Sequence, residues 1–238
     1  MKLIASFFSL TLAVFQLSGC QRGAPFDPAS AVSFFPLNPG ATWTYRVIDE
    51  KLKTSEVFTD RAVGQQQGDS AMGGHSAVAE SSGTDHERNL TILYKVEDGY
   101  VTRLIPFGDG SQTLSGEQEF LPRLLKPGLK WSNSVFPFGS LSEGFQLTQT
   151  HRTSLENATV QVPAGNFTNC IRIETEAVYK ANSSAKAISA RRLKYVDWYA
   201  PNVGLIKTQV LETGYFGGEV ARVELLSFGD SPVKTVSR

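Results

Sequence analysis

Apolar and polar residues alternate with a period of two through much of the sequence from Phe34 onward, and no window of a dozen residues shows the 3.6-residue period of an amphipathic helix. A period of two places successive side chains on opposite faces of a strand. In the clearest case, segment 171–180, one face would present Ile171, Ile173, Ala177 and Tyr179, and the other Arg172, Glu174, Glu176 and Lys180. The pattern predicts a mainly β chain with little helix.

Other strands are expected where aromatic and β-branched residues lie between clusters of turn-forming residues. These segments are 42–48, 88–97, 100–107, 145–150, 192–199, 204–212 and 219–228. Asp98-Gly99 predicts a two-residue hairpin, because both residues tolerate positive φ, and 214–218 is expected to form a turn. A short helix over 117–125 would be limited by Pro122. The segment 64–83 is expected to form a long loop or weak edge strands.

The phrase P-G-x-x-W occurs twice, at Pro39–Trp43 and at Pro127–Trp131. Pro-Gly sets a tight turn, and an aromatic residue early in the next strand can fill a core. Because the two copies are divergent, similar turns feeding similar strands are favoured over an internal duplication.

The first twenty residues are interpreted as a processing signal rather than part of the fold. Met1-Lys2 precedes a charge-free apolar stretch, Leu3 to Phe15, which has the length of a signal-peptide core and is short for a transmembrane helix. Leu17-Ser18-Gly19-Cys20 follows and resembles the lipobox of bacterial lipoproteins at all four positions. This resemblance implies diacylglycerol on the sulfur of Cys20, cleavage after Gly19 and acylation of the new amino terminus.

We therefore expect a lipoprotein signal peptide at 1–19, a tether at 20–33, a single β domain at 34–229 and a frayed tail at 230–238. The membrane is the expected partner through the lipid on Cys20, since several acyl chains hold a protein more firmly than one. Gln21 is not the aspartate that favours inner-membrane retention in enteric-type sorting, which favours the outer membrane facing the periplasm. A plain secretory signal with a chance cysteine is the alternative.

Charge and cysteine content exclude several classes of protein. The 23 basic and 23 acidic side chains give no net charge, so nothing in the electrostatics favours nucleic acid as a partner. Two cysteines, Cys20 and Cys170, are too few for a disulfide framework or a four-cysteine zinc site. Cys170 lies in an alternating segment, where a buried inert thiol is expected rather than a nucleophile.

Three segments together resemble a group of uncharacterised bacterial lipoproteins and secreted proteins. They are FPLNPGATWTY at 35–45, VPAGNF at 162–167 and DWYAPNVGLIK at 197–207. The resemblance implies one antiparallel, strongly curved sheet, a half-barrel similar to periplasmic lipoprotein carriers. It implies no established activity, and no catalytic or binding residue is transferred.

The same motifs have local explanations. Pro201 and Gly204 predict a turn between two strands, and Gly165 allows a tight reversal after Pro163. Trp198 and the next residue, Tyr199, would point to opposite faces, so that one fills the core while the other lies on the outer surface or in a groove.

No catalytic constellation is recognised in the sequence. The histidines are His75, His86 and His151, and the neighbours in Asp85-His86-Glu87 would face opposite ways on a strand and could not chelate one ion together. Serine-hydrolase, zinc-protease and phosphate-loop phrases are absent from the sequence. We predict no catalytic, metal or cofactor site, and Cys20, as the lipid attachment residue, is the site residue predicted.

Arg192 and Lys194 share a face beside Trp198 and could bind an anion or stack a ring. The solvated face of an edge strand is the favoured interpretation, because basic residues protect edges against unwanted pairing.

The leading hypothesis is a non-enzymatic envelope lipoprotein whose curved sheet binds a lipid-like ligand or a protein partner. The alternative is a structural or assembly subunit that docks by its sheet edges into a larger envelope complex. A third hypothesis is a hydrolase or metal enzyme that uses His75, Asp85 and His86. The sequence does not separate the first two and leaves the oligomeric state open.

Overall fold

The structure is a computed structural model. It describes residues 31–65, 76–82, 90–97, 100–104, 106–107, 112–113, 118–135, 145–156, 159–181, 191–213 and 221–230. The predicted signal peptide with Cys20, the tether up to residue 30, the Asp98-Gly99 turn, the turn at 214–218 and the tail beyond Asp230 lie outside the described residues.

The described elements are one short 3₁₀ helix and sixteen strands. They are η1 (Ala31–Phe34), β1 (Ala41–Asp49), β2 (Thr54–Gln65), β3 (Ser76–Ser82), β4 (Leu90–Glu97), β5 (Tyr100–Leu104), β6 (Pro106–Phe107), β7 (Gln112–Thr113), β8 (Gln118–Leu121), β9 (Lys130–Val135), β10 (Phe145–Glu156), β11 (Val160–Val162), β12 (Gly165–Phe167), β13 (Cys170–Ala181), β14 (Arg191–Ala200), β15 (Gly204–Thr213) and β16 (Ala221–Asp230).

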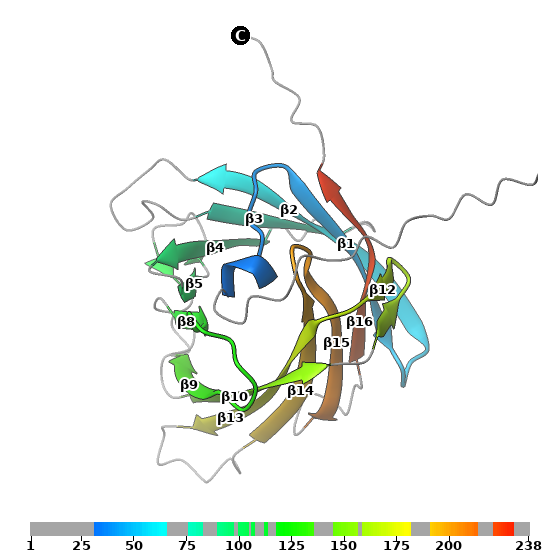
Figure 1. The fold of residues 1–238 in the computed structure, drawn as a ribbon. Helices are drawn as coiled ribbons and strands as arrows, with labels where there is room; N and C mark the ends of the chain where they lie inside the picture. Colours follow the sequence, from blue (N-terminus) through cyan, green and yellow to red (C-terminus); the bar gives the residue numbers. More distant parts are fainter. Residues whose placement is uncertain are drawn as a thin grey trace, which may run out of the picture.

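Twelve of the strands form one antiparallel sheet in the order β8-β5-β4-β3-β2-β1-β16-β15-β14-β13-β10-β9. Figure 1 shows these strands standing around a central space, with η1 beside it. The two edge strands, β8 and β9, lie close together. The side-chain amide of Asn133 on β9 donates a hydrogen bond to the carbonyl of Glu119 on β8 at 3.0 Å. No ladder joins β8 to β9 in the described part of the chain, so the sheet is not closed.

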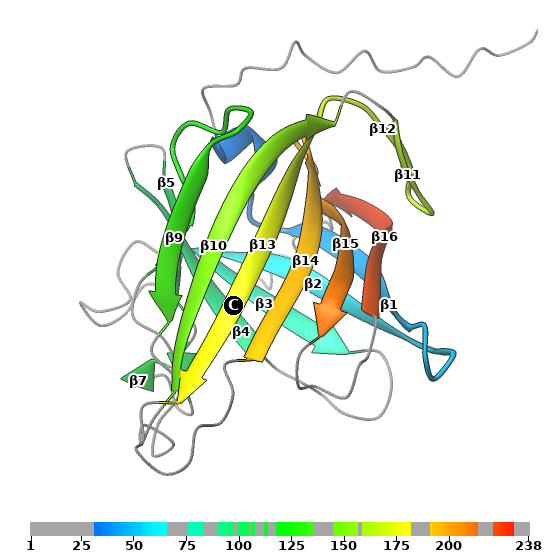
Figure 2. The same ribbon diagram turned by 90° about the horizontal axis from the view of Figure 1, so that it is seen from below.

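The prediction of a mainly β chain with little helix is confirmed. The prediction of a single sheet is wrong, because β6 with β7 and β11 with β12 form two further two-stranded sheets. Figure 2 shows the β11–β12 hairpin beyond one end of the row from β9 to β16. Pro163 and Ala164 form the turn of this hairpin, and Gly165, at φ 139°, follows as the first residue of β12, so the tight reversal expected after Pro163 is present.

Most predicted strands are present, and several are longer than expected. On β13, Ile171, Ile173 and Ala177 are buried, while Arg172 and Glu174 on the opposite face are not. The antiparallel pairing expected for the segments on either side of Asp98-Gly99 is confirmed by the β4–β5 ladder, in which Glu97 pairs with Tyr100.

Two expectations for the first half of the chain are wrong. The segment 118–121 is strand β8 rather than helix, because it pairs with β5 and buries Leu121. Within the segment 64–83, β3 lies between β2 and β4, so it is an interior strand rather than an edge. Its many small residues have low strand propensity, so the sequence indicated a strand only weakly. Pairing with neighbouring strands on both sides stabilises β3 in spite of that low propensity.

Both P-G-x-x-W phrases form turns that lead into strands. Gly40 precedes β1 and Gly128 precedes β9, with φ of 91° and 78°, a region open to glycine at little cost. The first tryptophan, Trp43, is buried, and its indole N–H donates to the carbonyl of Val203 at 2.6 Å.

The folded domain begins earlier than the predicted boundary at residue 34. Ala31 and Phe34 of η1 are fully buried, and the amide of Asn202 donates to the carbonyl of Ser33 at 2.6 Å. Ala31 is therefore part of the core, and Ser33 is joined to the domain by a backbone hydrogen bond. At the other end β16 continues one residue beyond the predicted end of the domain, pairing Asp230 with Ala41.

The core has two clusters of buried residues. One surrounds Trp43, Ile206 and Leu225 and includes the valines of β11. The other surrounds Phe34, Ile171 and Tyr199. Among the described residues, no helix is long and apolar enough to cross a membrane.

Candidate functional site

A cavity of about 310 Å³ lies among strands from both halves of the large sheet. Its volume is at the lower end of the range for small-molecule sites, roughly 300–1,000 Å³. Most of its lining is aromatic or apolar, and it also contains three charged side chains. The lining residues are Phe35, Pro36, Leu37, Trp43, Tyr45, Asp60, Tyr94, Arg103, Phe120, Tyr195, Asp197, Tyr199, Gly204, Leu205 and Thr208.

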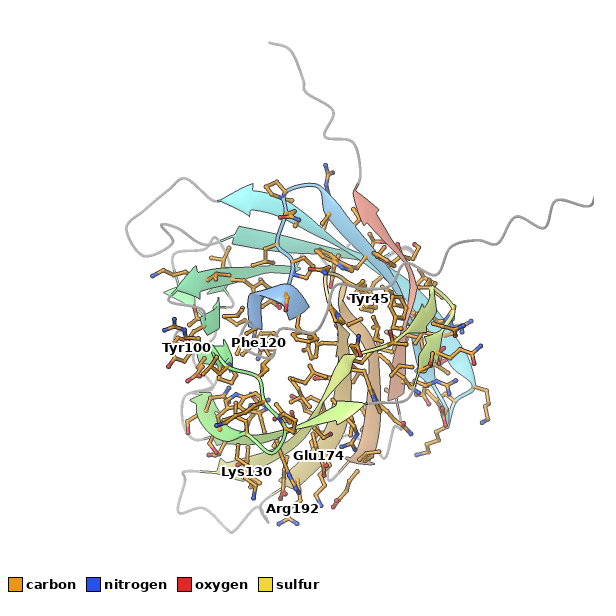
Figure 3. The ribbon with its side chains drawn as sticks, viewed as in Figure 1. Tyr45, Tyr100, Phe120, Lys130, Glu174 and Arg192 are labelled. Carbon is orange, nitrogen blue, oxygen red and sulfur yellow. The ribbon has the colours of Figure 1, made fainter. Side chains whose placement is uncertain are left out.

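Strand register explains why these side chains point inward. On β13 the buried residues Ile171, Ile173 and Thr175 stand opposite Tyr199, Asp197 and Tyr195 of β14. Because opposite residues of an antiparallel pair share a face, these three residues of β14 line the interior. In Figure 3, Tyr45 and Phe120 lie inside the ring of strands, whereas Lys130, Glu174 and Arg192 lie on its outside.

The chain just after η1 forms one wall of the cavity. The ring of Phe35 lies 4.6 Å from that of Tyr94 and 5.4 Å from that of Phe120, measured between centroids. Tyr94 and Phe120 are themselves 5.7 Å apart, which completes an aromatic cluster. Spacings of this order contribute beyond the burial of the rings, by about 0.5–1.5 kcal/mol for each pair.

Tyr45 of β1 contacts both β15 and β2. The hydroxyl of Tyr45 donates to the carbonyl of Leu205 at 3.1 Å, and its ring stacks on Phe58 at 5.1 Å. Burial raises the pKa of Tyr45 well above 10, and the charge of Asp60 adds to the shift. Tyr45 is therefore a neutral donor at physiological pH.

Asp197 places an acid in the cavity wall. The hydroxyl of Thr208 on β15 donates to Oδ1 of Asp197 at 2.6 Å. Burial raises the pKa of Asp197 from 3.8 to about 6, although the bond from Thr208 and the charge of Arg103 both lower it. The result is a carboxyl group that is harder to ionise than an exposed aspartate.

Arg103 places a cation in the same cavity. It pairs with Tyr94 across the β4–β5 ladder, and its guanidinium lies 4.8 Å from the centroid of the Phe120 ring. Within the described ranges, its guanidinium takes part in this cation–π contact. Asp60, placed opposite Trp43 by the β1–β2 ladder, is a second acid in the lining.

His151 lies near the cavity but does not line it. It is buried on β10, stacks on Trp131 at 4.7 Å, and its Nδ1 is 2.9 Å from the hydroxyl oxygen of Thr175. Burial lowers its pKa from 6.5 to about 4, and the charge of Arg103 adds to the shift. The ring is therefore neutral at physiological pH.

The residues of the metal-enzyme hypothesis, His75, Asp85 and His86, lie outside the described residues. Within the described ranges no three His, Cys, Asp or Glu side chains gather in a way that could hold a metal ion. Cys170 is buried, as predicted.

The basic residues of β14 are on the solvated outer face, but β14 is not an edge strand. It pairs with β13 on one side and β15 on the other. Arg192 forms an ion pair with Glu176 at 2.8 Å, and Lys194 forms one with Glu212 at 3.5 Å. The basic residues of β14 are therefore explained by cross-strand ion pairs and not by protection of an edge strand.

Trp198 and Tyr199 point to opposite faces, as predicted. Tyr199 is buried against the cavity. Trp198 lies on the outer face, where the Nζ of Lys207 is 5.1 Å from its ring centroid and the guanidinium of Arg172 is 5.8 Å away.

Sequence reasoning missed the three charged residues of the cavity. Asp197 could have been noticed, because it has the same parity as Tyr195 and Tyr199 within one alternating strand. Asp60 and Arg103 gave no such signal, because the pairing of β1 with β2 and of β4 with β5 places them inside.

Comparisons with known proteins give a partial family match and two structural neighbours. A family model described as DUF3108-like matches residues 138–213. No curated protein matches the sequence.

Two solved structures are similar over most of this chain. A candidate exported protein with a YmcC-like fold from Bacteroides fragilis NCTC 9343 is 13% identical, with a TM-score of 0.50, and the match covers 83% of this chain and 99% of that one. A candidate lipoprotein from Parabacteroides distasonis ATCC 8503 is 12% identical, with a TM-score of 0.47, and the match covers 82% and 98%. At this identity, the first of these similarities establishes a shared fold and nothing further.

Proposed function

We propose that this protein is a non-enzymatic lipoprotein of the bacterial envelope that binds a lipid-like ligand in the cavity of its large sheet. The observation behind this proposal is the cavity itself, about 310 Å³ lined by aromatic rings with a few polar groups among them. Apolar walls with a small number of placed polar groups are typical of small-molecule sites.

The envelope location rests on the sequence. The lipobox at Leu17–Cys20 would place acyl chains on Cys20, and Gln21 favours the outer membrane facing the periplasm. The structural neighbour from Bacteroides fragilis is described as an exported protein, which agrees with this location.

The architecture also supports ligand binding. The large sheet would act as a half-barrel, similar to that of periplasmic lipoprotein carriers, because β8 and β9 approach without forming a ladder. Residues 35–37, which follow η1, contribute to the lining, so the chain that leads from the predicted tether into the domain forms part of the site.

The test is to extract the acylated protein gently and identify by native mass spectrometry any small molecule that remains bound. Leu37→Trp would fill the cavity, and Leu211→Trp would add the same bulk on an exposed part of β15. We expect wild type and Leu211→Trp to retain an apolar ligand and Leu37→Trp to lose it.

Ligand-free wild-type protein that enters a defined multiprotein complex would contradict the proposal. That result would favour the structural or assembly subunit instead.

A further inference from the structure

Two opposite charges face the same cavity and do not pair with each other. The guanidinium of Arg103 lies over Phe120, and its charge lowers the pKa of Asp197, although no direct ion pair joins the two described side chains. The carboxyl group of Asp197 accepts from Thr208, which is a neutral donor. Charges held in a largely apolar site are costly unless they are compensated, so a ligand that satisfies both is favoured.

We infer that the cavity takes a single-chain amphiphile with a zwitterionic head group, whose cationic part lies beside Asp197 and whose anionic part is bound by Arg103. This inference rests on the proposed function, because it names the class of ligand for the same cavity.

The anionic part is assigned to Arg103 because of the geometry of its side chain. A guanidinium offers parallel N–H donors that match the oxygens of a phosphate or carboxylate. The ring of Phe120 covers one side of it at 4.8 Å, so its edge remains for an anion.

The cationic part is assigned to the region of Asp197. This residue lies between Tyr195 and Tyr199 on β14, and Trp43 and Tyr45 also line the cavity. Aromatic faces together with a carboxylate form the usual environment for ammonium groups. Burial raises the pKa of Asp197 to about 6, which indicates that its negative charge lacks a cation within the protein to compensate it fully.

The charge count of the lining disfavours a purely anionic ligand. The described lining contains the acid Asp197 as well as the cation Arg103. An amphiphile with only an anionic head would bind Arg103 and bring no cation to Asp197. A zwitterion compensates charges of both signs.

The size of the cavity favours one chain over two. A volume of about 310 Å³ is small for a ligand site, so it suits a compact head group with part of one chain. The apolar residues Phe35 and Leu37 would contact the start of that chain.

The test uses four amphiphiles that share a dodecyl chain and differ in the head group, each below its critical micelle concentration. They are dodecylphosphocholine, dodecyltrimethylammonium, dodecyl phosphate and dodecyl maltoside. Binding is measured on the mature acylated protein in a nonionic amphipol, and binding to Leu37→Trp is subtracted as background. We expect dodecylphosphocholine to bind about tenfold or more tightly than the other three, as the loss of one buried charge contact implies.

Matched variants assign the two charges. Asp197→Asn should weaken dodecylphosphocholine about tenfold, whereas Glu174→Gln on the outer face should leave its affinity unchanged. Arg103→Met should abolish the preference for dodecylphosphocholine over dodecyltrimethylammonium, and Lys207→Met, which removes a cation from the outer face, should preserve that preference. Arg103→Lys keeps the positive charge but loses the parallel N–H donors of the guanidinium, so it should retain part of the preference for dodecylphosphocholine. This variant replaces Arg103→Met in the test if Arg103→Met does not fold.

The outcomes separate the two proposals. If none of the four compounds binds above background, the proposed function fails, and this inference fails with it. If dodecyl phosphate or dodecyl maltoside binds best, or all four bind equally, the cavity still binds apolar chains and only the zwitterion inference is overturned.

Discussion

Replacing Asp197 by asparagine should make the protein more stable at alkaline pH. Asparagine keeps the size of the side chain and an oxygen that can accept from Thr208, but it has no charge to bury. Asp197 has a pKa of about 6 in the folded protein because burial disfavours its ionised form, against an ordinary value of 3.8. A shift of one pKa unit corresponds to about 1.36 kcal/mol, so ionised Asp197 lowers the stability of the folded state by about 3 kcal/mol.

The sign of the pH dependence follows from proton binding. Between pH 3.8 and about 6 the folded protein keeps the proton of Asp197 and the unfolded chain releases it. Stability due to this group therefore falls as the pH rises through that window. The gain from Asp197→Asn should be about 3 kcal/mol at pH 8 and about 1 kcal/mol at pH 4.5.

His151 acts in the opposite direction over nearly the same window. Its folded pKa of about 4 lies below the ordinary 6.5, because burial disfavours the charged ring. Between these values the unfolded chain binds a proton that the folded protein does not, so stability from His151 rises with pH. The two contributions nearly cancel in the wild type between pH 4 and pH 6, and in Asp197→Asn the rise from His151, about 2 kcal/mol, would remain.

Urea unfolding at pH 4.5, 6 and 8, followed by tryptophan fluorescence, measures these differences. Glu174→Gln removes a carboxylate from the outer face, where it pairs with Arg172 at 3.3 Å, and is the matched control. An Asp197→Asn variant whose advantage over wild type is the same at all three pH values would refute the argument. So would a variant less stable than wild type at pH 8.

Three further predictions follow from particular residues. Cys20→Ser removes the sulfur that would accept the lipid, so the precursor should stay uncleaved and incorporate no labelled fatty acid, whereas the wild type is labelled and enters the detergent phase; unlabelled wild-type protein in the soluble fraction would contradict this. Gly204→Ala should cost about 1–3 kcal/mol in urea unfolding because its φ is 97°, whereas Gly229→Ala, whose added methyl group would meet nothing within 4 Å, should cost little; equal costs would count against backbone strain. Thr208→Val removes the hydrogen bond to Asp197, so the pKa of that carboxyl group should rise further above 3.8, as measured by carbon-13 NMR, and an unchanged or lower value would rule out the assigned role of the bond.

Much of the fold could be predicted from the sequence because its signals are local. Alternation in 171–180 located β13 and its buried face, and Asp98-Gly99 indicated the antiparallel pairing of β4 with β5. Such patterns depend on neighbours within a few residues, so they can be recognised without knowing how the strands pair in the sheet. The lipobox is local in the same sense, and chemistry at Cys20 will test it.

Other features depended on partners distant in sequence. The segment 118–121 is a strand because it pairs with β5, and β3 is an interior strand because β2 and β4 flank it. Ala31 is buried, and Ser33 is joined to the domain by a hydrogen bond from the amide of Asn202, far along the chain.

The candidate site belongs entirely to this second group. Asp60, Arg103 and Asp197 come from β2, β5 and β14, and strand register places them inward, opposite Trp43, Tyr94 and Ile173 respectively. The sequence by itself determined that these segments are strands with two faces. Only the tertiary structure decided which face is enclosed, because a one-residue change of register would turn the same charged side chains outward to water.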